Sequence, residues 1–483
     1  MSLSTVIKSI QDIMRKDAGV DGDAQRITQL GWMLFLKIFD DREAEYETLD
    51  PDYQSVIPEE LRWRNWAKDP EGITGEGLLD FVDGKLFRTL KNLELPTTAD
   101  PRGFVVRDVF ADANNYMKNG TLIRQVVNKL TEIDFNRSED RHLFGDIYEQ
   151  ILRDLQSAGN AGEFYTPRAV TEFMVEMIDP QLGESVLDPA CGTGGFLTGV
   201  IDHVRSKHVE TPADEATLQA SIHGVEKKGL PHLLCTTNML LHGIEVPSCI
   251  RHDNTLARPL RDYGPKDRVN IVLTNPPFGG MEEDGIESNF PATFRTRETA
   301  DLFLVLIMHL LKLNGRCAMV LPDGTLFGEG VKTRIKEELL KTCNLHTIVR
   351  LPNGVFAPYT GIKTNLLFFE KGTPTEEIWY FEHPYPEGYK SYSKTKAIRL
   401  AEFHKLEKKW WKKRAENEHA WRVPIQQIID SGYNLDIANP HAPSEGPGDP
   451  DKLLAEYLKL VKEAAAARDA LKKQLADALE REE

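Results

Sequence analysis

The strongest constraint on the fold is an alternation of short β-rich runs with helical stretches that begins near residue 160. Most of these runs are separated by stretches with helical periodicity, which is typical of a doubly wound, mostly parallel sheet. Only PNGVFAPYTGI separates the last two runs, and because this is too short for a helical crossover we expect an antiparallel closing pair there. The predicted fold is therefore an α/β protein with a seven-stranded sheet, whose strand candidates are 185–190, 221–226, 249–254, 269–274, 315–321, 345–351 and 363–371.

Helical patterns precede the sheet. Apolar residues recur at helical spacing from Gln25 to Tyr46 and again from Leu122 to Leu130, which predicts amphipathic helices that share a core. No chemistry is visible in this part of the sequence. We expect an α-helical amino-terminal domain over 1–155, which supports or contacts other parts of an assembly, and a sheet domain over 156–438.

The last part of the sheet domain, 372–438, is a charged, Trp-rich appendix. Its basic run KKWWKKR, at 408–414, is a candidate DNA contact, but a solvated helix face with the tryptophans packed inward is the stronger interpretation. Residues 439–450 are rich in Pro and Gly and predict a linker. Over 451–483 apolar side chains keep a three-four spacing, which predicts a coiled-coil helix that needs a partner.

Charge and cysteine content narrow the possible functions. The 483 residues carry a formal net charge of −16, the wrong sign for a protein that grips nucleic acid over a broad surface by itself. A nucleic-acid substrate would therefore require a partner.

The five cysteines are widely spaced and contain no Cys-x-x-Cys pair, so we expect reduced thiols and no metal site. Without an apolar signal core or a run long enough to cross a bilayer, we expect a cytoplasmic protein with no membrane contact.

The strand candidate 269–274 ends in the turn Asn275-Pro276-Pro277-Phe278. Ligands bind beyond the carboxyl ends of strands in open α/β sheets, and this end has groups that suit a nucleobase amine. Such an amine is a poor nucleophile because its lone pair is delocalised into the ring. The Asn275 side-chain oxygen and the Pro276 carbonyl can accept hydrogen bonds from its two N–H groups. Phe278 can stack on a base taken out of the helix. Methyl transfer from a sulfonium then needs only in-line positioning.

The first strand candidate ends at Asp188, before a glycine-rich loop, Gly192 to Gly195. Glycines there let the backbone approach a ligand, and the following helix offers unpaired N–H groups. A dinucleotide fingerprint is disfavoured because Leu197 stands where it requires glycine. A carboxylate before the loop suits a cationic or hydroxyl-bearing ligand instead.

The next two strand candidates also end in acidic residues. Glu226 is placed to accept both ribose hydroxyls of an adenosine cofactor, and Asp253 and Asn254 are placed at an adenine edge. Each of these acidic residues alone is more often a helix cap or a turn residue. Their occurrence at consecutive strand ends favours an adenosine pocket.

These motifs follow the order EFYTPR (163–168), DPACGTGGF (188–196), GVE, DN and NPPF. In this order the chain resembles the amino-methylating DNA methyltransferases whose cofactor motif precedes the catalytic motif. It resembles more closely the modification subunits of type I restriction-modification systems, through the leading helical domain and the segments VLPDGTLF (320–327) and LPNGVFAPYTGIKTNLLFFEKG (351–372). Within the segment 163–168, Thr166 and Pro167 also have a simpler interpretation than a functional role, namely ordinary capping of the helix that follows.

The resemblance implies S-adenosylmethionine as methyl donor and N6 of adenine in duplex DNA as acceptor. It also implies assembly of two such subunits with one specificity subunit, and with restriction subunits for cleavage. Because no large target-reading domain follows the catalytic motif, sequence readout would belong to the specificity subunit, and the coiled-coil tail would be one means of docking.

The resemblance also assigns residues to two sites and implies no metal. Cys191 stands where family members often carry a small residue such as Ala. The catalytic motif is matched by Asn275, Pro276, Pro277 and Phe278. The cofactor positions are matched by Glu163, Phe164, Tyr165, Thr166, Pro167, Arg168, Asp188, Gly192, Thr193, Gly194, Gly195, Glu226, Asp253 and Asn254.

Two alternatives compete with this interpretation. A methyltransferase acting on RNA or on glutamine in proteins also carries an N-P-P-aromatic motif, but the helical domain and coiled-coil tail argue against such a small enzyme. An inactive cofactor-binding scaffold belongs to a different class. The intact Asn275 and Phe278 argue against that scaffold.

Overall fold

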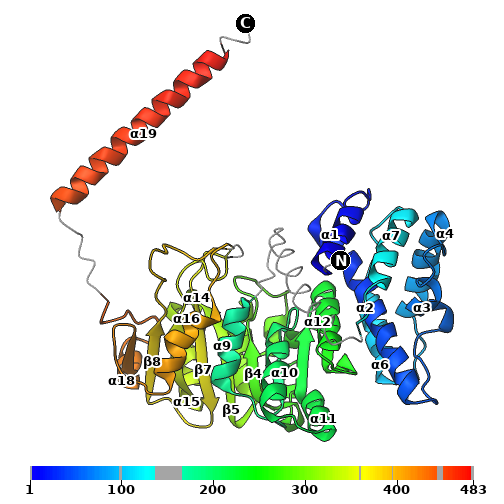
Figure 1. Cartoon of the computed structure of the whole chain (residues 1–483). Coiled ribbons are helices and arrows are strands. Elements are labelled where there is room, and N and C mark those ends of the chain that lie inside the picture. The colour runs from blue at the N-terminus through cyan, green and yellow to red at the C-terminus, as the bar shows by residue number, and fades with distance from the viewer. Residues whose placement is uncertain are drawn as a thin grey trace. The chain divides into compact units, whose positions relative to one another are not determined.

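The computed structural model describes residues 3–96, 100–135, 166–357, 360–393, 395–442 and 450–479. The chain divides into two compact units, Met1–Ala438 and Asn439–Glu483. The first contains a helical region and a β-sheet, and the second contains one long helix, α19 (Pro450–Leu479) (Figure 1). Among the described residues no helix is both long and apolar enough to span a bilayer.

The helices expected before the sheet are present. The stretch Gln25 to Tyr46 lies within α2, and the apolar positions after Leu122 lie within α7. Side chains cap the amino-terminal ends of two of these helices. Asp100 accepts a hydrogen bond from the N–H of Arg102 in α6, and Asn119 accepts hydrogen bonds from two N–H groups of α7. The helices of this region are α1 (Leu3–Met14), α2 (Asp23–Leu49), α3 (Trp63–Trp66), α4 (Gly75–Asp80), α5 (Arg88–Lys91), α6 (Pro101–Ala111) and α7 (Gly120–Thr131).

In the described part of the chain a single mixed sheet follows, and it has nine strands rather than the expected seven. All seven expected strands are present, but two more, β8 and β9, come from the appendix 372–438. The prediction missed them because this segment was judged by its charge and Trp content, while the short runs EIWYFE and AWRVP have the aromatic and β-branched side chains of strands. The strands are β1 (Val186–Asp188), β2 (Ile222–Glu226), β3 (Ile250–His252), β4 (Val269–Thr274), β5 (Leu311–Pro322), β6 (Cys343–Arg350), β7 (Thr364–Lys371), β8 (Glu377–Glu382) and β9 (Ala420–Pro424).

The strand order is β3-β2-β1-β4-β5-β7-β6-β8-β9. Strands β1 to β5 pair in parallel, so their carboxyl ends meet at one edge. The expected antiparallel pair of β6 and β7 is confirmed. It does not close the sheet, however, because β7 inserts between β5 and β6, and β8 then pairs with β6 in parallel. This correction follows from the two unpredicted strands.

Helices cover both faces of the sheet, as expected for a doubly wound fold. Side chains alternate along β4: Ile271 and Leu273 join the core beneath α9 and α10, while Val272 joins the core beneath α13 and α15. Figure 1 shows α9, α10 and α16 on the near face. The helices are α9 (Arg168–Ile178), α10 (Gly195–His208), α11 (Pro212–Ser221), α12 (Gly229–Leu241), α13 (Thr299–Leu310), α14 (Asp323–Phe327), α15 (Val331–Thr342), α16 (Leu400–Lys405), α17 (Glu407–Trp411) and α18 (Ile425–Asp430).

Helix α12 belongs to two cores at once. Leu233 and Leu234 pack into the core of the helical region, where a Cβ on Gly31 of α2 would lie 3.0 Å from Leu233 Cδ2. Cys235 and Met239 of the same helix pack into the core beneath α9 and α10. The helical region is therefore anchored on the helix that also borders the glycine-rich loop.

The basic run 408–414 packs as expected. Trp410 is buried, and Trp411 meets Phe173 and Phe368 edge-to-face, with ring centroids 6.5 Å and 4.9 Å away. Lys409 and Lys412 are exposed. This confirms a solvated helix face whose tryptophans point inward.

Candidate active site

The turn after β4 is held by a hydrogen bond to the residue pair that precedes α9. Asn275 Nδ2 donates to Thr166 Oγ1 at 2.8 Å. Asn275 Oδ1 is buried and has no hydrogen-bond partner among the described residues. The amide is therefore oriented by its nitrogen, and its oxygen remains an acceptor for a ligand.

The rest of the turn is more enclosed than the sequence suggests. Pro276 is buried and Pro277 is exposed. The Phe278 side chain is only 6% exposed, and its ring meets that of Phe356 edge-on, with centroids 6.5 Å apart. Phe356 belongs to the segment after β6, and sequence reasoning did not assign it to the site. Its signal was available, because the segment 351–372 already carried the family resemblance.

Two glycines shape the loop after β1. Gly192 has a φ of +54° and Gly194 a φ of +85°, a region that disfavours other residues. A Cβ on Gly192 would meet no atom of the described residues within 4 Å, whereas a Cβ on Gly194 would lie 2.8 Å from Cys235 Sγ. Gly192 thus faces open space that suits a ligand, and Gly194 allows the loop to pack closely on α12.

Asn238 of α12 also supports this loop, and the sequence did not identify it. Its Nδ2 donates to the carbonyl oxygen of Thr193 at 3.1 Å, and the side chain is 2% exposed. The signal for it was hidden inside an apolar helix, because nothing in the local pattern indicates which loop Asn238 meets. The loop is consequently positioned by the same helix that anchors the helical region.

The Glu226 carboxylate connects the ends of β1 and β2. One oxygen, Oε2, accepts the N–H of Gly192 at 2.9 Å, and the other, Oε1, accepts the N–H of Lys228 at 2.8 Å. Because a carboxylate oxygen can accept more than one hydrogen bond, both atoms can still receive hydroxyl groups. This geometry suits the ribose contact predicted for Glu226.

Asp188 is a buried carboxyl at the end of β1. It is 1% exposed, and its Oδ1 accepts the Thr274 hydroxyl at 2.7 Å and the Ala190 N–H at 3.1 Å. Burial, with a smaller contribution from the charge of Glu226, raises the pKa of Asp188 to about 7. A cationic ligand beside it would favour the ionised form.

Asp188→Asn is expected to make the stability of the ligand-free protein less dependent on pH. The folded-state pKa of about 7 exceeds the unfolded value of about 3.9, so the stabilisation present below about pH 4 is lost as the pH rises through about 7. Asparagine keeps an acceptor oxygen but does not ionise. The Tm of the variant minus the Tm of the wild type should therefore rise from pH 5 to pH 8 in thermal unfolding. An equal value at both pH values would contradict this account.

The end of β3 agrees less well with the prediction. The Asp253 side chain is 53% exposed and lies 3.9 Å from that of Arg251. Its backbone N–H donates to the backbone carbonyl oxygen of Glu226 at 3.0 Å. Asn254 Oδ1 accepts the N–H of Leu256 and so shapes a turn. The structure brings both residues beside Glu226, but their side chains act here as a surface charge and a turn former.

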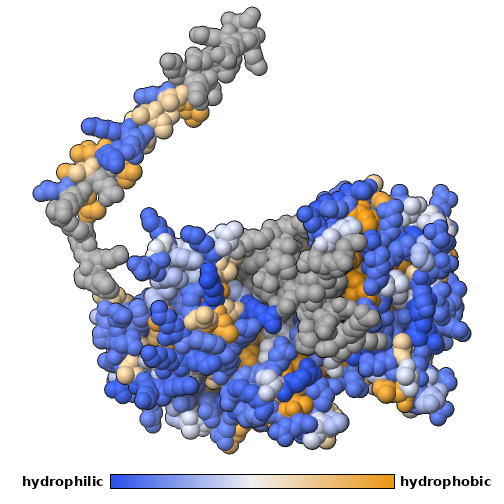
Figure 2. All heavy atoms as spheres, viewed as in Figure 1, coloured by the Kyte–Doolittle hydropathy of each residue, from blue (hydrophilic) through white to orange (hydrophobic). Residues whose placement is uncertain are grey.

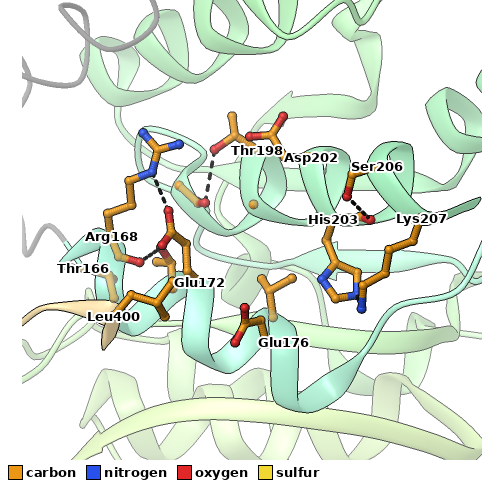
Figure 3. A pocket seen from close by; sticks show the side chains of 14 residues that line it. Thr166, Arg168, Glu172, Glu176, Thr198, Asp202, His203, Ser206, Lys207 and Leu400 are labelled. Carbon is orange, nitrogen blue, oxygen red and sulfur yellow. Dashed lines mark hydrogen bonds and ion pairs between the residues drawn. The ribbon is translucent and has the colours of Figure 1, made fainter. Parts of the chain in front are cut away.

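The segment 163–168 is described only in part. Glu163, Phe164 and Tyr165 lie outside the described residues. Arg168 Nε donates to Glu172 Oε1 at 2.8 Å. Thr166, Arg168 and Gly195 line one end of a groove of about 350 Å³ between α9 and α10, whose other side chains have mixed charge (Figure 3).

The loop and strand ends fit the S-adenosylmethionine expected from the sequence. Open space beside Gly192, acceptor oxygens on Glu226 and the buried carboxyl of Asp188 match a ligand with ribose hydroxyls and a cationic centre. Within the described ranges no cluster of three or more His, Cys, Asp or Glu side chains could hold a metal ion. All five cysteines are described, and none forms a disulfide in this structure.

Comparisons with known proteins agree with this geometry. Residues 139–447 match the family model for N-6 DNA methylase, and residues 3–130 match that for the HsdM N-terminal domain. The chain is 64% identical to the type I restriction enzyme EcoEI methylase subunit of Escherichia coli, over 99% of both chains. It is 31% identical to the EcoKI methylase subunit of Escherichia coli K12, over 76% of this chain and 68% of that one.

Solved structures show the same likeness. A chain from a structure of a type I R-M system, described for its complex assembly and conformational transition, aligns with a TM-score of 0.82 and 38% identity over 99% of both chains. A chain from Vibrio vulnificus YJ016, assigned as a type I modification subunit, aligns with a TM-score of 0.81 and 47% identity over 91% of this chain and 97% of that one. The chain therefore belongs to the N-6 DNA methylase family, among the methylase subunits of type I restriction enzymes, and is an adenine-specific DNA methyltransferase that uses S-adenosylmethionine.

Proposed function

We propose that Asn275 Oδ1 and the Pro276 carbonyl oxygen accept hydrogen bonds from the two N–H groups of the adenine N6 amine in duplex DNA. The observation that carries this proposal is the state of the Asn275 amide: its nitrogen donates to Thr166, while its buried oxygen has no partner among the described residues. An unsatisfied buried acceptor is costly unless a ligand completes it. Acceptors on both N–H bonds localise the N6 lone pair for attack.

The remaining residues of the turn hold the base in place. Pro276 and Pro277 restrict the backbone, so the two acceptors keep their spacing. Phe278 packs beside the flipped base, and the contact of its ring with Phe356 supports a pocket wall made by both aromatic side chains. The donor, when bound, supplies a methyl group activated by its positive sulfur. As the N–C bond forms, the bond between the methyl carbon and sulfur breaks, and the amine releases one proton to water. Asn275 Oδ1 accepts a hydrogen bond from the amine and does not take up that proton.

The cofactor-binding residues are proposed from the same edge of the sheet. Glu226 holds the ribose hydroxyls, and Asp188 faces the cationic part of the donor. The supporting observations are the hydrogen bond between Glu226 and the loop and the open space beside Gly192. The other proposed cofactor positions are Thr166, Pro167, Arg168, Thr193, Gly194, Gly195, Asp253 and Asn254, together with Glu163, Phe164 and Tyr165.

Transfer of a tritiated methyl group to DNA tests this function. The complex of this chain with its specificity subunit, given labelled S-adenosylmethionine and unmodified genomic DNA from a strain that lacks the system, should yield labelled N6-methyladenine. Digestion of the DNA to nucleosides and chromatography measure it. Label on RNA or protein, or no label in any product, would contradict the proposal.

The chain is proposed to consist of a helical domain (1–155), a methyltransferase domain (156–438), a linker (439–450) and a coiled-coil helix (451–483). The division into compact units after Ala438 supports the start of the linker. The separate matches to the HsdM N-terminal domain over 3–130 and to N-6 DNA methylase over 139–447 support two domains before it. We place the protein in the cytoplasm, where its DNA substrate lies.

The proposed assembly has two copies of this chain, one specificity subunit and further restriction subunits. The acidic net charge of −16 supports delegation of DNA sequence readout to a partner. Helix α19 is the proposed docking element, and Figure 2 shows orange patches on it. Its exposed side chains at three-four spacing form one stripe, of which Leu454 is 57%, Tyr457 63% and Val461 45% exposed. A helix with such a stripe is stabilised by pairing with another helix.

Two acidic substitutions on the stripe, Leu454→Asp with Val461→Asp, are expected to prevent assembly with the specificity subunit. Each places a charge in the apolar seam that a coiled coil buries. Size-exclusion chromatography with light scattering measures the mass of the complex. Lys459→Asp is the matched control, because Lys459 is 75% exposed and lies off the stripe. Assembly of the double variant at wild-type stoichiometry would refute this docking mode.

A further inference from the structure

The appendix 372–438 contacts both supports of the catalytic turn, and this gives it a role that its sequence did not suggest. One support is α9, which begins two residues after Thr166, the partner of Asn275. The other is the segment 351–357 after β6, which contains Phe356, the partner of Phe278. Each support is itself packed against side chains of the appendix.

The first support is held by α16 and α17. Phe403 of α16 stacks on Phe173 of α9 with ring centroids 4.4 Å apart and an interplanar angle of 10°. Glu176 of α9 lies 2.8 Å from His404 Nε2 and 3.0 Å from Lys408 Nζ. A stacked ring pair, a hydrogen bond and an ion pair thus fix the helix whose amino-terminal end orients the Asn275 amide.

The second support is held by the segment 383–392, which follows β8. A Cβ on Gly354, whose φ is +83°, would lie 2.3 Å from the carbonyl oxygen of Tyr392, so the two backbones are in direct contact. The Tyr385 hydroxyl donates to the carbonyl of Asn353 at 3.2 Å. The position of Phe356 therefore depends on where Tyr392 and its neighbours lie.

A buried hydrogen-bond network fixes that segment and ties it to α16 and α17. The Tyr392 hydroxyl donates to Glu402 Oε2 at 2.6 Å and lies 3.2 Å from His383 Nε2. His383 Nδ1 lies 2.5 Å from Glu407 Oε1, and both of these side chains are fully buried. The ring of His383 also packs on Phe403, with centroids 5.0 Å apart. One network thus connects both supports.

Such a network is costly to bury and is not needed to complete the sheet. Its polar atoms lie in the core beside α9, where apolar side chains of the same size would avoid their desolvation. Burial raises the pKa of Glu407, which reflects this cost. Glu407 Oε2 is buried without a hydrogen-bond partner among the described residues, so this cost is only partly offset. The directional hydrogen bonds of the other polar atoms nevertheless hold one arrangement where apolar packing tolerates several.

We propose that Tyr392, His383, Glu402 and Glu407 act as positioning residues for methyl transfer, by holding both supports of the Asn275–Phe278 turn in register. This inference rests on the proposed roles of Asn275 and Phe278. None of the four residues is among those proposed above to bind the base or the donor. Loss of the network lets Phe356 and Thr166 shift relative to each other, which misplaces the target amine without removing any group that binds the donor.

Tyr392→Phe tests the proposal, because it removes one hydroxyl and leaves the aromatic ring and the backbone that contacts Gly354 in place. The kcat for methyl transfer to genomic DNA from a strain that lacks the system should fall about tenfold, since small misplacements of reacting groups have large effects on rate. The KM for S-adenosylmethionine should stay within about twofold, because no donor contact changes. Both are measured with tritiated donor and the complex of this chain with its specificity subunit.

Tyr380→Phe is the matched control. Tyr380 is also buried in the appendix, and its hydroxyl also donates one hydrogen bond, to the Leu435 carbonyl at 3.1 Å, but it lies in the core on the opposite face of the sheet. Similar losses in Tm with a lower kcat for Tyr392→Phe alone support the proposal. Equal kcat values for the two variants, or a changed KM for the donor with unchanged kcat, would overturn it. A wild-type complex that labels no DNA would instead refute the proposed function.

Discussion

Asn275→Ala should reduce methyl transfer by about 10²- to 10³-fold, the range seen when an enzyme loses one group that contacts developing charge. The variant loses the acceptor oxygen that lies buried and without a partner among the described residues. It also loses the side-chain nitrogen that donates a hydrogen bond to Thr166. Affinity for S-adenosylmethionine should remain, because Asn275 itself is not among the proposed donor-binding residues and its partner Thr166 is still present in the variant.

The measurement combines two assays on the same complex. Transfer of tritium to genomic DNA from a strain that lacks the system gives kcat, and isothermal titration calorimetry gives the Kd for the donor. Asn275→Asp is the informative companion, since a carboxylate keeps an acceptor oxygen in the same place and should keep part of the activity. An alanine variant with more than about a tenth of the wild-type kcat would contradict the assigned role.

Glu226→Ala should weaken binding of S-adenosylmethionine about 100-fold. The carboxylate accepts the N–H groups of Gly192 and Lys228, and we propose that it also receives the ribose hydroxyls. Hydrogen bonds to a charged group contribute about 1.5–3 kcal/mol each, and 1.4 kcal/mol corresponds to a factor of ten in Kd. Loss of the carboxylate therefore removes both a ligand contact and the support of the loop.

Asp214→Ala is the matched control for Glu226→Ala in the same calorimetric titration. Asp214 Oδ2 also accepts two backbone N–H groups, from Glu210 and Thr211, but it caps α11 at the surface. The control should leave the Kd unchanged. If both substitutions weakened binding equally, general destabilisation would explain the effect, and Glu226 would lose its proposed role.

Together the two substitutions separate chemistry from binding. Asn275 and Glu226 lie at the ends of β4 and β2, on either side of β1. If the assigned roles hold, one variant binds the donor without transferring its methyl group, and the other loses the donor first. The distinction depends on strand order, because β1 places Asp188 between them.

Much of the sheet was predictable because its strands follow local rules. The run 269–274 has β-formers that end abruptly at Asn275, and the structure places the end of β4 at Thr274. β8 was missed although its run, 377–382, has the side chains of a strand. Its pairing with β6 is formed between segments far apart in the sequence, and a short strand without flanking helices lacks the alternation on which the prediction depended.

The site was predictable to a smaller extent. Asn275 was assigned from the chemistry of its own turn. Its orientation by Thr166, which is 109 positions away in the chain, has no local signal. Asn238 and Phe356 were missed for the same reason, since each supports a loop from a different element.

By itself the sequence determined the succession of the first seven strands, the residues at their ends and the family. These properties depend on side-chain periodicity and on short motifs, which are local. Only the tertiary structure decided which of the Asn275 polar atoms is satisfied, how β7 inserts next to β5, and how the appendix meets both supports of the catalytic turn. These depend on contacts between distant segments, whose partners are set by packing of the whole core rather than by any local pattern.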